Sequence, residues 1–259
     1  MSETAAPPLE KPRRFHFNWV IPALLRPRAA FRQIAEHAGD AWLTPLLVLT
    51  LAELARVLAV GNVRQVLAAS GQVTLPPDFQ YWPPTMQEQF MQAQQAVSGP
   101  VFLYVLPGFV ALMGIWLGWL LLAGILHLVL TMLGGRNPTR NALNVVAWAA
   151  LPLAVRSLVR AGFALSTQTL ITSPGLAGFA PLDATLLSAV LRALGSQIDI
   201  YFIWYTLLTL LGARLASGLP TGKVVAGGLA AVLIVLALQT APGLVVGRFE
   251  GLEALRSLF

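Results

Sequence analysis

The sequence contains no cysteine, so this chain can form neither a disulfide nor a thiolate metal site. A cysteine nucleophile and S-acylation are excluded for the same reason. Charged residues are also scarce: they make up 11% of the chain, whereas a soluble domain carries about 25%. So little polar material cannot cover a soluble surface. This excludes an ordinary soluble enzyme, a disordered tail protein and a coiled coil.

Hydrophobic residues are correspondingly abundant. They account for 56% of the 259 residues, and the mean hydropathy is +0.70. Such a composition is typical of an integral membrane protein that crosses the lipid bilayer several times. The formal net charge of +6 would suggest nucleic acid in a soluble chain. Here the basic residues lie beside apolar runs, so we interpret them as topology signals and contacts to anionic lipid, and expect no nucleic-acid partner.

The first forty residues divide into two parts. Residues 1–16 are polar and rich in proline, and we expect them to be disordered. Residues 17–40 are amphipathic and basic, which is typical of a helix on the membrane surface, although a solvated linker is the alternative. Its apolar residues can share one side, and Pro27 is expected to start a second helical piece. Those apolar residues are Ile21, Leu24, Leu25, Phe31 and Ile34, and the expected lipid headgroup contacts are Arg26, Arg28 and Arg32.

Five apolar stretches within residues 41–246 can cross the hydrocarbon core, which takes about 20 helical residues. The second is longer than one span needs, and because it contains no turn signal we expect one helix, bent at Pro107-Gly108 or projecting from the bilayer. Pro152 is expected to kink the third span, and the fifth should bend or end near Pro242. The predicted spans are residues 41–60, 101–133, 143–159, 196–213 and 224–246, followed by a short tail at 247–259.

Helical spacing of apolar residues also recurs in the two long connections, residues 61–99 and 161–195. We therefore predict an all-α, polytopic membrane protein: a bundle of about five transmembrane helices with amphipathic surface helices. The larger share of lysine and arginine faces the cytoplasm if the N-terminus does. We expect a multi-pass protein of the cell (plasma or inner) membrane, with an uncleaved cytoplasmic N-terminus and, because the number of spans is odd, an outside C-terminus.

Charged residues inside the predicted spans are the sharpest functional signal. Glu53 and Arg56 share one face of the first span. Arg156 and Arg160 lie near the outer end of the third span, and Asp199 lies near that of the fourth. Each would cost a few kcal/mol facing lipid, so we expect them to face one another or water.

This charge cluster allows three interpretations. It could form a polar cavity that opens outward and takes a solute or a partner's loop. Alternatively, ion pairs of Glu53 with Arg56 and of Asp199 with Arg156 fix the helix register. The arginines could also extend to the membrane interface.

Two pairs of glycines are spaced for close helix approach. They are Gly114 with Gly118, and Gly243 with Gly247. We expect them to pack inside the bundle, with a seam between two copies in a homo-oligomer as the alternative. Catalytic signatures are missing: the three histidines make no metal-ligand spacing, and no serine occupies a Gly-x-Ser-x-Gly frame. We expect no metal, no cofactor and no enzymatic activity.

Two motifs resemble bacterial Yip1-domain proteins. Residues 25–34 read LRPRAAFRQI and are followed by WLTPL at residues 42–46. Residues 134–139 read GGRNPT and are followed by LNVVAWAALP at residues 143–152. The resemblance extends over about residues 25–240 and implies a five-span helical membrane domain with a cytoplasmic N-terminus.

The resemblance also suggests what such a protein does. Eukaryotic relatives take part in vesicle trafficking and bind small GTPases, but their Asp-Leu-Tyr-Gly-Pro stretch is absent here, which argues against GTPase binding. Some bacterial relatives are associated with ABC-type export systems. We therefore predict a non-enzymatic integral membrane scaffold or accessory subunit of a membrane complex. Its protein partner would meet the outer loops near Phe79, Tyr81 and Trp82. The alternative is a small solute transporter or channel that uses the charge cluster.

Overall fold

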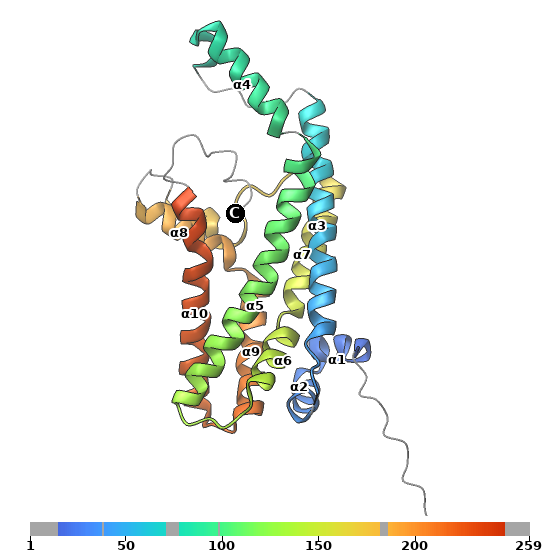
Figure 1. Ribbon diagram of the computed structural model, residues 1–259, viewed down its shortest axis with the longest axis vertical. Helices are drawn as coiled ribbons and strands as arrows, with labels where there is room; N and C mark the ends of the chain where they lie inside the picture. Colours follow the sequence, from blue (N-terminus) through green and yellow to red (C-terminus); the bar gives the residue numbers. More distant parts are fainter. Residues whose placement is uncertain (1–14, 38, 71–77, 98, 182–185, 247–259) are drawn as a thin grey trace, which may run out of the picture.

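The computed structural model describes residues 15–37, 39–70, 78–97, 99–181 and 186–246, and within these ranges it contains helices and no strand (Figure 1). The main helices are α1 (Val20–Leu25), α2 (Pro27–Glu36), α3 (Leu43–Ala69), α4 (Pro84–Val97), α5 (Leu106–Met132), α6 (Thr139–Ala149), α7 (Leu151–Thr167), α8 (Leu186–Gln197), α9 (Ile200–Ser217) and α10 (Thr221–Val246). A π-helical turn, Val101–Val105, precedes α5. Three 3₁₀ turns are Phe17–Trp19, Phe79–Tyr81 and Gly175–Phe179.

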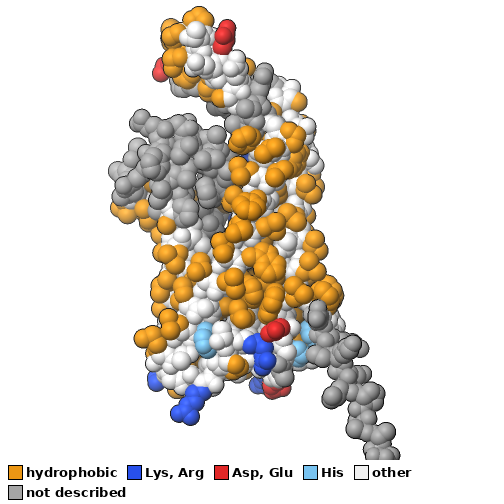
Figure 2. Space-filling model, in the orientation of Figure 1, with side chains coloured by type: hydrophobic (Ala, Val, Ile, Leu, Met, Phe, Trp, Pro, Cys, Tyr) orange, Lys and Arg blue, Asp and Glu red, His pale blue; other side chains and the backbone are white. Residues whose placement is uncertain are grey.

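Five helical segments in the described part of the chain are long and apolar enough to cross a membrane. This confirms the predicted all-α, polytopic fold. On the face shown in Figure 2, hydrophobic side chains cover the middle of the bundle, and lysine and arginine gather at its lower end. The segments are Leu43–Ala69, Val101–Met132, Thr139–Thr167, Ile200–Ser217 and Thr221–Ala241.

Prolines set the irregularities of two spans. The second span is one continuous segment whose winding changes from π to α just before Pro107, which has no N–H to donate and lies in the first turn of α5. The third span divides at Ala150 into α6 and α7, with Pro152 in the first turn of α7, where proline is tolerated. Helix α10 continues through Pro242 and ends about one turn later at Val246, and the bend at Pro242 stays a prediction.

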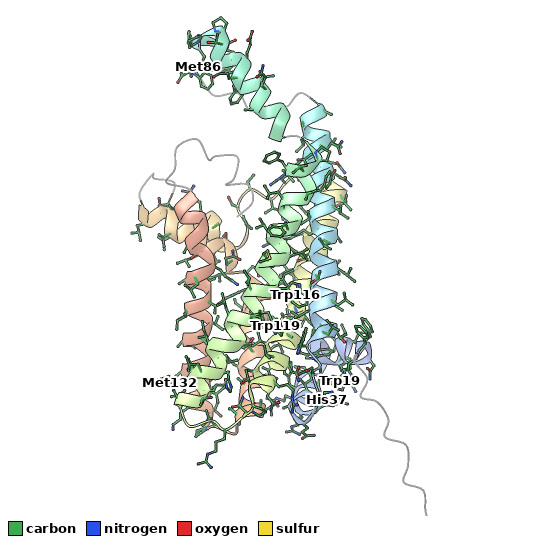
Figure 3. All side chains as sticks on the ribbon, in the orientation of Figure 1. Trp19, His37, Met86, Trp116, Trp119 and Met132 are labelled. Atoms are coloured by element: carbon green, nitrogen blue, oxygen red, sulfur yellow. The ribbon has the colours of Figure 1, made fainter. Side chains whose placement is uncertain are left out.

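Helices α1 and α2 lie at the lower end of the bundle in Figure 1. Helix α3 packs along α7, and α5 lies between α6 and α10. One core cluster is centred on Leu126 and Val146, and a second on Phe31 and Trp148. Figure 3 shows Trp116 and Trp119 on α5, and Trp19 beside His37 at the lower end.

Polar side chains of α6 join this end of the bundle to the segment between α2 and α3. The Asn144 side chain accepts from the Ala41 N–H at 2.9 Å and donates to the Gly39 carbonyl at 3.1 Å. The indole N–H of Trp148 donates to the Ala41 carbonyl at 3.0 Å. Asn144 and Trp148 are fully buried, so these bonds satisfy groups that would otherwise destabilise the core.

The N-terminal amphipathic segment differs from the prediction. The chain breaks at Arg26, because Pro27 starts α2 as expected, and the two helices turn different sides to the bundle. Phe31 of α2 is fully buried against the bundle, as is its neighbour Ile34, whereas Ile21 of α1 is 66% exposed. The prediction that they share one apolar side is therefore wrong. Arg26, Arg28 and Arg32 are exposed, and their contact with lipid headgroups stays a prediction.

A glycine allows α2 to pack against α9. A Cβ atom at Gly212 would lie 2.7 Å from Cδ1 of Phe31 and 2.6 Å from Cγ1 of Val145. The Gly212→Ala variant should therefore lower the free energy of unfolding by about 1–3 kcal/mol, the usual cost of overpacking a core. Thermal unfolding of the purified protein in detergent, followed by circular dichroism, measures this change as a lower Tm.

The matched control is Gly114→Ala on α5, where an added Cβ meets nothing within 4 Å. Alanine favours a helix over glycine by up to about 1 kcal/mol, so this Tm should stay unchanged or rise slightly. Equal Tm losses in the two variants would contradict the packing of α2 on α9.

Candidate functional site

The structure brings the five charged residues of the predicted cluster together, between the middle of α3, α7 and the start of α9. Glu53 and Arg56 are on α3, and Arg156 and Arg160 are on α7. Asp199 is the N-cap of α9: its backbone is extended, and its carboxylate accepts from the Phe202 N–H at 2.9 Å. Asp is one of the residues preferred at this position, because its side chain satisfies an N–H that has no partner within the helix.

The carboxylate of Glu53 joins α3 to α7. Its Oε1 accepts from Nε of Arg56 at 2.9 Å and from Nη2 at 2.6 Å. Its Oε2 accepts from the hydroxyl of Ser157 on α7 at 2.5 Å. Both carboxylate oxygens are thus used. Sequence reasoning missed Ser157, although its position three residues before Arg160 placed it on the same face of the helix.

The carboxylate of Asp199 joins α7 to α9. Its Oδ2 lies 3.1 Å from Nη2 of Arg160 and 3.7 Å from Nη1 of Arg156. The expected pairing with Arg156 is therefore present, but Arg160 is the closer partner. The side chains in these ion pairs are between 14% and 29% exposed, so the charges satisfy one another within the protein.

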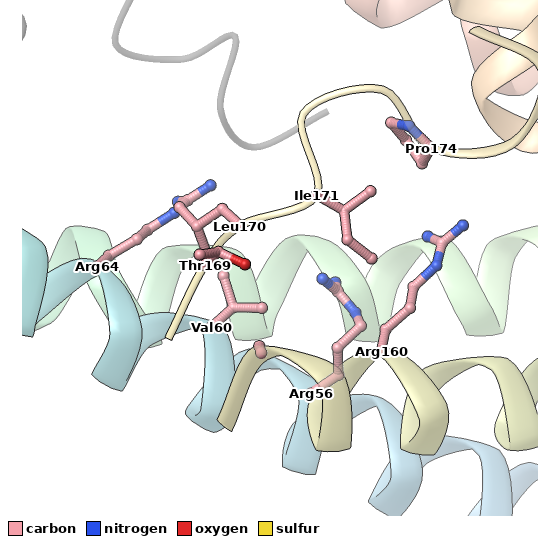
Figure 4. A pocket seen from close by; sticks show the side chains of 9 residues that line it. Arg56, Val60, Arg64, Arg160, Thr169, Leu170, Ile171 and Pro174 are labelled. Carbon is pink, nitrogen blue, oxygen red and sulfur yellow. The ribbon is translucent and has the colours of Figure 1, made fainter. Parts of the chain in front are cut away.

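A cavity of about 180 Å³ adjoins this network (Figure 4). Helices α3 and α7 form one wall, and the segment after α7 passes over them and forms the other. Sequence reasoning missed both Arg64, a little over two turns beyond Arg56 on α3, and this second wall. The lining residues are Arg56, Val60, Arg64, Arg160, Ala164, Thr169, Leu170, Ile171 and Pro174.

Comparison with known proteins identifies the family. The family model of the Yip1 domain matches residues 22–241. The chain belongs to the Yip1 domain family. No curated protein and no solved structure matches the chain. The match includes every residue of the charge cluster and of the cavity, so both lie within the Yip1 domain.

The two glycines of the first pair in this Yip1 domain have different surroundings. An added Cβ at Gly118 would lie 2.5 Å from Nε2 of Gln239, so α5 and α10 approach each other there, whereas at Gly114 it would meet nothing within 4 Å. Gly243 lies in the last turns of α10, where the structure does not describe side chains, and Gly247 lies outside the described residues. Packing of that second pair stays a prediction.

Removing the shared carboxylate tests whether the network holds the spans together. Asp199→Asn keeps the side-chain shape and the capping oxygen but leaves Arg156 and Arg160 without their anionic partner. Removing one partner of a fully buried ion pair lowers the free energy of unfolding by about 3–5 kcal/mol. Because these side chains are partly exposed, we expect a loss of about 2 kcal/mol, measured as a lower Tm in detergent. Asp78→Asn, an exposed aspartate outside the spans, is the matched control and should leave the Tm unchanged.

The double variant Asp199→Asn with Arg160→Gln provides a second measurement. It removes one of the two unpaired guanidinium groups, so its Tm loss should be smaller than the sum of the two single losses. Strict additivity would show that the pair contributes nothing to stability.

Proposed function

We propose that this Yip1-domain protein is a non-enzymatic scaffold or accessory subunit of a complex in the cell membrane. The single observation that carries the proposal is a small helical unit, residues 78–97, that projects from the bundle (Figure 1). The family resemblance points to an ABC-type export system as the class of complex. The partner would be another integral membrane protein whose extramembranous part meets this unit.

The projecting unit has a small aromatic core of its own. The rings of Phe79, Trp82 and Phe90 lie with centroids 5.4 Å to 5.7 Å apart. The side chain of Gln87 donates to the carbonyl groups of Phe79 and Trp82 at 3.1 Å and 3.0 Å. Two of the aromatic residues expected to meet a partner therefore pack against the unit itself, which gives it a fixed shape.

Other apolar side chains of the unit remain on its surface. Tyr81 is 79% exposed, and Met86 and Met91 are exposed on α4. Figure 3 shows Met86 at the far end of the projection. Exposed tyrosine and methionine suit protein contact, because tyrosine offers a rigid apolar ring with a polar tip and methionine adapts to irregular surfaces. These exposed residues support the assignment of this surface to a partner.

The distribution of basic residues supports a cytoplasmic N-terminus. In the described residues, α1 and α2 share their end of the bundle with the α5–α6 and α9–α10 turns, and α10 ends at the opposite end (Figure 1). The end with α1 and α2 carries the larger share of basic residues outside the charge cluster, as expected for the cytoplasmic side. These are Arg26, Arg28, Arg32, Arg136, Arg140, Arg214 and Lys223.

Single-cysteine labelling tests this orientation, because the natural chain has no cysteine to remove. In sealed cells, a membrane-impermeant maleimide should label Ser173→Cys and should label Ala29→Cys only after the membrane is permeabilised. Both positions are exposed, at opposite ends of the bundle. Labelling of Ala29→Cys alone in sealed cells would show the inverse orientation.

Site-specific photo-crosslinking tests the scaffold role. A photoreactive phenylalanine derivative at position 81 should capture one membrane protein in near-stoichiometric yield, and the adduct should be lost when Met86 and Met91 are changed to serine. The same probe at Phe179, an exposed aromatic residue outside the unit, is the matched control and should not capture that protein. Capture that is equal at both positions, or that survives the Met86 and Met91 changes, would rule out this surface as the binding site.

The alternative function, solute transport through the charge cluster, is favoured by the cavity beside the arginines. The Asp199→Asn protein separates the two roles when it is reconstituted in liposomes. A transporter would lose solute flux in this variant, whereas a scaffold would keep the adduct formed at position 81.

A further inference from the structure

The cavity beside the charge cluster is lined by three arginines. Figure 4 shows the side chains of Arg56 and Arg160 extending from α3 and α7 toward the segment that contains Ile171 and Pro174. Arg64, from the last turns of α3, lines the same cavity. Three arginines from two helices thus line one cavity, and the other described residues of its lining are apolar apart from Thr169.

Among the described ion pairs, the charges next to this space leave a positive excess. Arg56, Arg156 and Arg160 carry three positive charges, whereas Glu53 and Asp199 supply two negative ones. The bonds to Glu53 use Nε and Nη2 of Arg56, and the bond to Asp199 uses Nη2 of Arg160. A guanidinium group has five N–H donors, so Nη1 of Arg56 and Nη1 of Arg160 remain for a ligand's oxygen atoms.

The depth of the cavity indicates the source of the anion. Helix α3 rises about 1.5 Å per residue, so Arg56 lies roughly 20 Å and Arg64 roughly 31 Å along the helix from Leu43. The hydrocarbon core is about 30 Å thick. With Leu43 near one interface, the cavity extends from within the opposite leaflet to the level of its headgroups. The apolar lining, including Val60 and Leu170, suits the part of a lipid next to its phosphate.

We propose that this cavity binds the phosphate group of an anionic phospholipid from the leaflet opposite α1 and α2. Arginine is suited to this ligand because its planar N–H groups pair with two phosphate oxygens at once. The space, about 180 Å³, is large enough for a phosphate group but not for the acyl chains of the lipid. The acyl chains would lie outside, against the apolar surface of the bundle. This inference does not rest on the scaffold role.

The test uses the full chain in a neutral detergent and three probes: dihexanoyl phosphatidic acid, dihexanoyl phosphatidylcholine and inorganic phosphate. Each is titrated while the Tm is recorded, because a ligand that binds only the folded protein raises its Tm. Phosphatidic acid should raise the Tm with a saturable dose dependence, and phosphatidylcholine, whose phosphate is offset by a choline cation, should have a much smaller effect. If inorganic phosphate acts at the same concentrations, the anion site stands and its source is the free ion.

Two variants locate the site, and a third is the matched control. Arg64→Gln should weaken the response to phosphatidic acid about tenfold, equivalent to about 1.4 kcal/mol. Thr169→Trp should weaken it as well, by filling the cavity without removing a charge. Arg192→Gln changes the net charge equally at the same end of the protein but outside the cavity, and should respond as the wild type does.

Several results would overturn the proposal. They are no Tm increase with either phosphatidic acid or inorganic phosphate, an equal effect of phosphatidylcholine, and an equal loss of response in Arg192→Gln and Arg64→Gln. A response that is intact in both Arg64→Gln and Thr169→Trp would likewise place the ligand elsewhere.

Discussion

The structure depends on one constraint: an ionised side chain within a hydrocarbon layer must find its counter-charge inside the protein. Asp199 meets this constraint for two arginines of α7, and Glu53 meets it for Arg56 of its own helix while it accepts a hydrogen bond from Ser157 of α7. Because an unpaired charge costs far more than a poorly packed methyl group, these contacts restrict how the three helices can slide or rotate against one another. Apolar packing between spans is less selective, since lipid chains compete for the same surfaces.

Buried polar groups are satisfied by different kinds of interaction at the two ends of the bundle. At the end with α1 and α2, neutral groups of Asn144 and Trp148 bond to the backbone around Ala41, inside a tightly filled core. At the opposite end, ion pairs hold the helices and a cavity remains beside them. A neutral network can be closed by its own hydrogen bonds, whereas three cations paired with two anions leave a net positive charge.

Both proposed functions lie at this second end. The unit around α4 projects from it, and the cavity opens between α3, α7 and the segment after α7 (Figures 1 and 4). Membership of the Yip1 domain family assigns no ligand to either feature, because function resides in particular side chains and not in a fold. A lipid phosphate held between α3 and α7 would also stabilise the end of the bundle from which the α4 unit extends.

The sequence by itself determined the features that depend on local chemistry. Apolar length fixed the five spans, and Pro27 and Pro152 fixed where α2 begins and where the third span divides, because proline restricts its own turn whatever surrounds it. The grouping of Glu53, Arg56, Arg156, Arg160 and Asp199 also followed from sequence, since charges in a membrane must face one another. Only the tertiary structure decided that Phe31 faces protein while Ile21 is exposed, and that Ser157 and Arg64 join the site. In a bilayer, an apolar helix face suits lipid and protein equally well, so its sequence pattern cannot show which one it meets.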